Sequence, residues 1–139
     1  MDRRRVIRAV LSICAVSLFL ALSGCVPGAI VEWTIAPNER SSASTQDLER
    51  LRQLLGALGY VKGGAGSSSM PNAEFFSSSA SDRFNIALLP EGNGAIRVKL
   101  IEHGAKELSS IGRQQMALVA ETLDKEFGRA RITLTQRPS

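Results

Sequence analysis

The sequence predicts an α+β fold in which a four-stranded antiparallel sheet carries two helices on one face. Three observations lead to this class. Four segments alternate apolar and polar residues, which is typical of half-buried strands. Two longer segments repeat apolar residues at helical spacing. These segments follow one another in the order β-α-β-β-α-β, and 139 residues are enough for one such domain.

The first strand is expected over residues 30–36, where Val31, Trp33 and Ile35 share one face. A helix is expected to follow over residues 44–58. One face of this helix consists of leucines at helical spacing: Leu48, Leu51, Leu54, Leu55 and Leu58. Gly59 comes directly after them, in the place of a left-handed C-terminal cap.

The segment 62–82 differs in composition, because seven serines and three glycines crowd into it with little periodicity. We expect a mobile Gly/Ser-rich loop here. The loop contains two adjacent aromatic residues, Phe75 and Phe76. Exposed aromatic side chains can mark a binding site, but the pair could equally fold back over the domain.

Two strands are expected over residues 84–90 and 96–101, joined by the strong hairpin-turn signal Glu91-Gly92-Asn93-Gly94. An amphipathic helix should run from residue 106 or 109 to residue 127. The last strand is expected over residues 131–136. The domain therefore spans residues 30–139.

This order of elements is the pattern of the ferredoxin-like split unit. Right-handed crossovers would place both helices on one face of the sheet and leave the other face uncovered. The alternative is an α+β sandwich with a different strand order.

The charge of the chain is unevenly distributed. The formal net charge is +4, but residues 1–24 hold four arginines against one aspartate, a net of +3. The rest of the chain holds 13 basic and 12 acidic residues. The basic balance is therefore a property of the N-terminal segment and does not indicate nucleic-acid binding by the domain.

The uncovered sheet face is the first candidate for binding. Arg97, Lys99 and Arg131 are expected on it, and three cations together could bind an anionic partner. An RNA-binding sheet would display aromatic residues for base stacking, and none is expected on this face. The alternative is a solvated face whose charges discourage edge pairing.

Catalytic residues are sparse. His103 is the only imidazole of the chain, and it follows Glu102 near a strand end. Adjacent strand residues point to opposite faces, so these two side chains are not expected to form one site. The serines lack a Gly-x-Ser-x-Gly elbow. We therefore expect no catalytic, cofactor-binding or metal-binding residues, although a small hydrolase that uses His103 stays as a less favoured hypothesis.

The N-terminal segment has three parts. Arg3, Arg4, Arg5 and Arg8 form a positive region, residues 9–22 are uncharged and largely apolar, and Leu22-Ser23-Gly24-Cys25 follows. The apolar run is shorter than the roughly 18 residues that span a bilayer, and it suits a signal peptide. A transmembrane or buried helix is the alternative. The arginines also loosely resemble a twin-arginine export signal, but an ordinary positive region accounts for them.

Leu-Ser-Gly-Cys after such a run resembles the lipobox of bacterial lipoproteins. The resemblance implies that residues 1–24 are removed and that Cys25 receives a diacylglycerol. Residues 25–29 would then be the lipidated cysteine and a short tether. Val26 occupies a position where aspartate commonly marks retention in the inner membrane, which favours the outer membrane, facing the periplasm.

These observations predict a lipid-anchored envelope protein with a small non-catalytic interaction module. Its expected partners are the membrane, through Cys25, and a protein of the envelope. The alternative is a ligand-binding protein that uses the basic sheet face or the 62–82 loop. Neither a cofactor nor a nucleic-acid partner is expected.

Overall fold

The computed structural model describes residues 28–38, 43–65 and 72–137. Its elements are β1 (Ala29–Ile35), α2 (Ala43–Ala57), β2 (Tyr60–Ala65), β3 (Glu74–Ser78), β4 (Phe84–Pro90), β5 (Ile96–Glu102), α3 (Ser110–Phe127), the 3₁₀ turn η1 (Arg129–Arg131) and β6 (Ile132–Gln136). The predicted α+β class with two helices is confirmed. The predicted signal peptide and the lipidation residue Cys25 lie outside the described residues.

The sheet has six strands in the order β2-β3-β4-β5-β1-β6, and every neighbouring pair is antiparallel. The four predicted strands correspond to β1, β4, β5 and β6, which lie side by side. The predicted strand number was wrong, because the hairpin β2–β3 extends the sheet beyond β4. The predicted ferredoxin-like arrangement of four strands is therefore not matched in full.

The hairpin β2–β3 also corrects the expectation of a loop over residues 62–82. Lys62 pairs with Phe76, and Phe76 in turn pairs with Ile86 of β4. Phe76 is 3% exposed and belongs to the main core. The serine-rich composition concealed this strand, because serines occupy its more exposed positions while one aromatic side chain anchors it.

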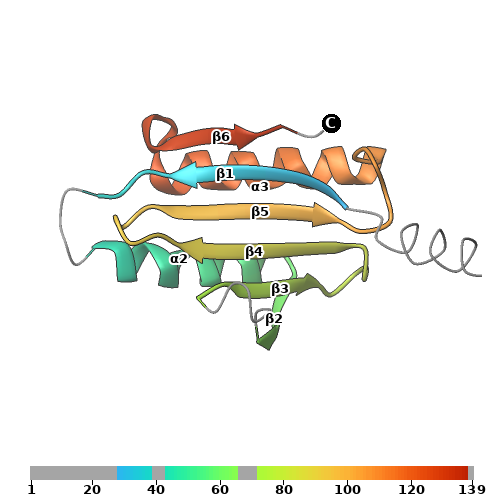
Figure 1. Ribbon diagram of the computed structural model, residues 1–139, viewed down its shortest axis with the longest axis horizontal. Coiled ribbons are helices and arrows are strands. Elements are labelled where there is room, and N and C mark those ends of the chain that lie inside the picture. Colours follow the sequence, from blue (N-terminus) through green and yellow to red (C-terminus); the bar gives the residue numbers. More distant parts are fainter. Residues whose placement is uncertain (1–27, 39–42, 66–71, 138–139) are drawn as a thin grey trace, which may run out of the picture.

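Both helices cover the same face of the sheet, behind the strands in the view of Figure 1. A single core joins this sheet face to the two helices. Its fully buried members include Val31, Leu51, Ile86, Val98 and Val119. Each such aliphatic side chain contributes about 1.5–3 kcal/mol on burial. The predicted layer of helices on one face is therefore present, and none of the helices that the structure describes covers the opposite face.

Glycines with positive φ angles follow both helices and lie in the β4–β5 turn, and the predicted cap at Gly59 is among them. Gly59 after α2 has a φ of 87°, and Gly94 in the β4–β5 turn has a φ of 88°. In that turn, the Glu91 backbone N–H donates to the Ala95 carbonyl at 2.8 Å. Gly128 ends α3 with a φ of 83°. These positive angles favour glycine because it lacks a Cβ.

Candidate functional site

The sheet face opposite the helices, which we call the open face, is the candidate site. Its side chains form three rows across the strands, as the register of the pairs shows. The rows are Thr133–Thr34–Arg97–Leu89, Glu32–Lys99–Ala87–Phe75 and Ile30–Ile101–Asn85–Ser77–Val61. The open face is therefore mixed. In the first two rows, polar and charged residues lie over β1 and β5 and a small apolar area lies over β3 and β4. The third row places two isoleucines beside an asparagine and a serine.

Glu32 holds the centre of the charged area. Its side chain is only 10% exposed, and the Thr135 hydroxyl donates to its Oε1 at 2.9 Å. Lys99 Nζ lies 3.4 Å and Arg97 Nη1 3.7 Å from Glu32 Oε2. One strand, β5, thus supplies both cations to the Glu32 carboxylate of β1, and β6 supplies the hydroxyl of Thr135.

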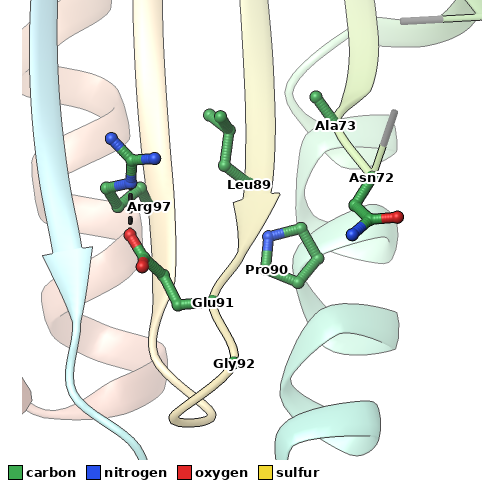
Figure 2. Close-up of a pocket in the computed structure, with 7 residues that line it drawn as sticks. All are labelled: Asn72, Ala73, Leu89, Pro90, Glu91, Gly92 and Arg97. Atoms are coloured by element: carbon green, nitrogen blue, oxygen red, sulfur yellow. Dashed lines mark ion pairs between the residues drawn. The ribbon is translucent and has the colours of Figure 1, made fainter. Parts of the chain in front are cut away.

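A second carboxylate balances Arg97. Arg97 Nε lies 2.5 Å from Glu91 Oε1, across the hairpin turn (Figure 2). The contact is an ion pair by distance but lacks the alignment of a hydrogen bond. Together, Arg97 and Lys99 face Glu32 and Glu91, so the formal charges of the four groups cancel. The electrostatic attraction of this area for an anion is correspondingly weak.

The prediction that Arg131 joins Arg97 and Lys99 on this face was wrong. Arg131 lies in η1, because β6 begins only at Ile132. Its Nη2 lies 2.7 Å from Asp47 Oδ2 and donates to the Ala36 carbonyl at 2.9 Å. Arg131 thus connects the start of α2 to the end of β1. It stabilises the fold and is not available to a partner on the open face.

The aromatic pair is divided between the two faces. Phe75 is half-buried on the open face, where it packs against Ala73, Ala87 and Leu89. Phe76 points into the main core, so its prediction as a partner-binding residue was wrong. The alternation of side chains along β3 separates the two neighbours. Of the two aromatic residues, Phe75 alone stays a candidate for binding.

A shallow hollow lies beside this apolar area, at the β4–β5 turn. Its volume is about 240 Å³, and it is lined by Asn72, Ala73, Leu89, Pro90, Glu91, Gly92 and Arg97 (Figure 2). Pockets for drug-sized ligands usually have about 300–1,000 Å³. This hollow is large enough for one side chain of a partner, and its Arg97 side is occupied by the ion pair with Glu91.

The sequence reasoning missed the buried carboxylate of Glu102. Glu102 is 0% exposed at the end of β5. Its Oε1 accepts from Arg83 Nη2 at 2.9 Å, and its Oε2 accepts from the Ser109 backbone N–H at 3.0 Å. Ser109 is the N-cap of α3, so the carboxylate also lies at the positive end of the helix dipole. This arrangement joins β5 to α3 and is structural.

A glycine makes room for that carboxylate. A Cβ added at Gly112, in the first turn of α3, would lie 2.1 Å from Glu102 Oε2. Gly112 lies three residues after the N-cap Ser109. A glycine at this place in a helix was the one signal in the sequence that could have indicated the close approach of another group to the helix.

A second ion pair connects α2 to β3. Arg52 Nε donates to Glu74 Oε2 at 2.9 Å, and Arg52 Nη1 donates to Glu49 Oε2, also at 2.9 Å. The hydrogen bond from Arg52 is the main cause that lowers the pKa of Glu74. In return, Glu74 is the main cause that raises the pKa of Arg52. This pair therefore anchors the strand that the sequence reasoning mistook for loop.

His103 is separated from Glu102, as predicted. The Asn85 side-chain amide lies 2.9 Å from His103 Nε2, on the exposed side of the sheet, whereas Glu102 is buried. Within residues 28–38, 43–65 and 72–137, no cluster of three His, Cys, Asp or Glu side chains is suited to a metal ion. In the same part of the chain, no helix combines the length and apolarity needed to cross a bilayer.

In comparisons with protein-family models, curated proteins and solved structures, nothing matches this chain.

Proposed function

We propose that this protein is a lipid-anchored component of a bacterial envelope, and that its α+β domain is a non-catalytic interaction module. The observation that carries the proposal is the N-terminal pattern, in which four arginines and an uncharged apolar run precede Leu22-Ser23-Gly24-Cys25. The structure supports the proposal in one respect. Strand β1 begins at Ala29, the last residue of the proposed tether, so the folded domain starts four residues after Cys25.

The proposed anchor is a thioether at Cys25. A phospholipid supplies the diacylglyceryl group, its phosphate headgroup leaves, and the thiol proton is lost as the carbon–sulfur bond forms. Cleavage before Cys25 then exposes an amine that is acylated in turn. A single acyl chain holds a protein only marginally, whereas two or three chains anchor it stably.

The chain contains a matched control for this proposal, because its second cysteine, Cys14, lies inside the segment to be removed. In cells given labelled palmitate, the wild-type protein and Cys14→Ala should both incorporate label, and Cys25→Ala should not. Mass spectrometry should find a mature N-terminus at Cys25 that carries lipid. Label that persists in Cys25→Ala rules out this anchor.

We further propose the outer membrane as the location, on the basis of Val26. Wild-type protein should fractionate with the outer membrane. Val26→Asp should move the protein to the inner membrane, and an unchanged distribution would show that this residue does not direct sorting.

The open face is the proposed docking surface for an envelope partner. The half-buried Phe75 supplies apolar contact area, and the hollow beside Arg97, which the buried Leu89 lines, could take one partner side chain. A second candidate function, binding of an anionic ligand, is favoured only by the position of Arg97 at that hollow. It predicts that Arg97→Ala or Lys99→Ala weakens binding to anionic envelope material and that added salt does the same. Binding that is unchanged in both variants excludes it.

A further inference from the structure

The chain enters the domain at Gly28, directly before β1. An added Cβ at Gly28 would lie 2.7 Å from the Glu102 carbonyl oxygen and 3.1 Å from Ile101 Cγ2. Gly28 therefore packs against the end of β5. The start of β4 lies at the same end, because Phe84 pairs with Glu102. We call this end of the domain, where β1 and β4 begin and β5 finishes, the tether end.

The length of the tether restricts the domain strongly. Three residue steps separate Cys25 from Gly28. At no more than about 3.6 Å per residue, they span at most ~11 Å. If Cys25 carries lipid, Gly28 cannot be farther than this from the membrane interface. The tether end is then held at the headgroup region.

The tether end carries two exposed apolar side chains. Among the described large apolar side chains, Val61 is 61% exposed and Ile111 is 54% exposed, and these are the two highest values. Both lie at this end. Val61 belongs to the row of the open face that Ile30 and Ile101 begin, and Ile111 lies in the first turn of α3.

A cation accompanies these apolar residues. Arg83 precedes β4 at the same end, and its side chain stays 55% exposed although one nitrogen is paired with Glu102. Exposed aliphatic side chains and an exposed guanidinium at the same end of a domain suit an interface where acyl chains meet phosphate groups. If the domain stood away from the membrane, the exposed apolar surface of Val61 and Ile111 would be in contact with water.

From these observations we infer that the tether end rests on the phospholipid headgroups of the membrane that holds the anchor, with the long axis of the domain directed away from the bilayer. This inference rests on the proposed lipidation of Cys25. In this orientation, α3 begins at the membrane and runs away from it, because its N-terminus lies at the tether end (Figure 1). The β4–β5 turn and the hollow beside Arg97 lie at the far end, accessible to a partner.

Helix α3 contains positions that can test this orientation. Ile111, Leu118 and Lys125 follow one another at intervals of seven residues, and all three side chains are exposed. Seven residues are about two helical turns, so the three positions lie on one side of the helix at steps of ~10 Å along its axis. Each can be replaced by cysteine without removing a buried group. In the lipidated protein, the Cys25 sulfur is a thioether and does not react with thiol labels.

The experiment uses the lipidated full chain in vesicles that contain a phospholipid with a nitroxide on its headgroup. Ile111→Cys, Leu118→Cys and Lys125→Cys each carry a thiol-linked fluorophore, and circular dichroism checks that each variant is folded. We expect strong quenching at residue 111, less at residue 118 and least at residue 125. Equal quenching at the three positions, or the reverse order, overturns the inference.

Flotation of the vesicles separates this result from a failure of the proposed function. Wild-type protein should float with the vesicles, and Cys25→Ala should not. A protein that floats but shows no gradient along α3 overturns only the orientation. A protein that carries no lipid and does not float overturns both proposals.

Discussion

The pocket that Gly112 leaves for the Glu102 carboxylate gives the sharpest test of the fold. In Gly112→Ala, the new Cβ would lie 2.1 Å from Glu102 Oε2, well inside van der Waals contact. Glu102 is fully buried and held by Arg83 and Ser109, so its carboxylate cannot swing into solvent without breaking these bonds. We therefore expect Gly112→Ala to destabilise the protein.

The size of the effect follows from two opposing contributions. Alanine in place of glycine inside a helix normally stabilises by about 1 kcal/mol. Loss of one hydrogen bond to a buried charged group costs about 1.5–3 kcal/mol. With one of the two Glu102 bonds lost, the net change is a destabilisation of about 0.5–2 kcal/mol. Gly56→Ala in α2 is the matched control, since a Cβ at Gly56 would meet nothing within 4 Å.

The assay is the free energy of unfolding in urea for both variants. Gly56→Ala should stabilise by roughly 0.5–1 kcal/mol, whereas Gly112→Ala should destabilise. A double-mutant cycle with Glu102→Ala locates the cause. In the Glu102→Ala background, Gly112→Ala should become stabilising because the clash is gone. The reasoning is refuted if Gly112→Ala stabilises the wild-type protein as Gly56→Ala does, or if its effect is the same in both backgrounds.

Three further predictions concern stability. Arg52 holds the pKa of Glu74 below its ordinary value of 4.5, so their ion pair stabilises the fold above pH 4.5, and this contribution is lost as the pH falls through the lowered pKa. Arg52→Met should therefore be destabilised by about 1 kcal/mol or less at pH 7. In an acid titration followed by circular dichroism, its stability should approach that of the wild-type protein at low pH. Phe76→Ala should lower the free energy of unfolding by about 3–5 kcal/mol, whereas Phe75→Ala, on the open face, should cost clearly less; similar losses in urea unfolding would contradict the assignment of the two faces. Arg131→Ala should destabilise by about 1–3 kcal/mol in the same assay, because it leaves a buried aspartate unpaired, and a change near zero would show that Arg131 is merely a surface residue.

The sequence predicts those parts of the fold that depend on local periodicity. Both helices, the β4–β5 turn and the alternation in β1, β4 and β5 are local patterns, and the structure has each of them. Val31, Trp33 and Ile35 were assigned to one face for the same reason, and all three are buried. Local patterns also separate Glu102 from His103, because neighbours on a strand point to opposite faces.

The parts that could not be predicted depend on contacts between distant residues. The strand β3 forms because Phe76 reaches the core and Glu74 pairs with Arg52 of α2, and neither contact leaves a pattern in a serine-rich segment. The charges on the open face cancel in part because Glu32 and Lys99 are paired opposite one another in the register of β1 and β5. A count of basic residues on one face could not show that each has an acidic neighbour.

The position of β1 inside the sheet has a consequence for how the chain folds. β1 is the first strand that the structure describes, yet Trp33 pairs with Val98 of β5 on one side and with Leu134 of β6 on the other. During synthesis, β1 must therefore wait until nearly the whole described chain has emerged before both of its edges are paired. Pairing over such long sequence separations slows folding. A version that stops before β6 would leave β1 as an open edge on which other chains could assemble.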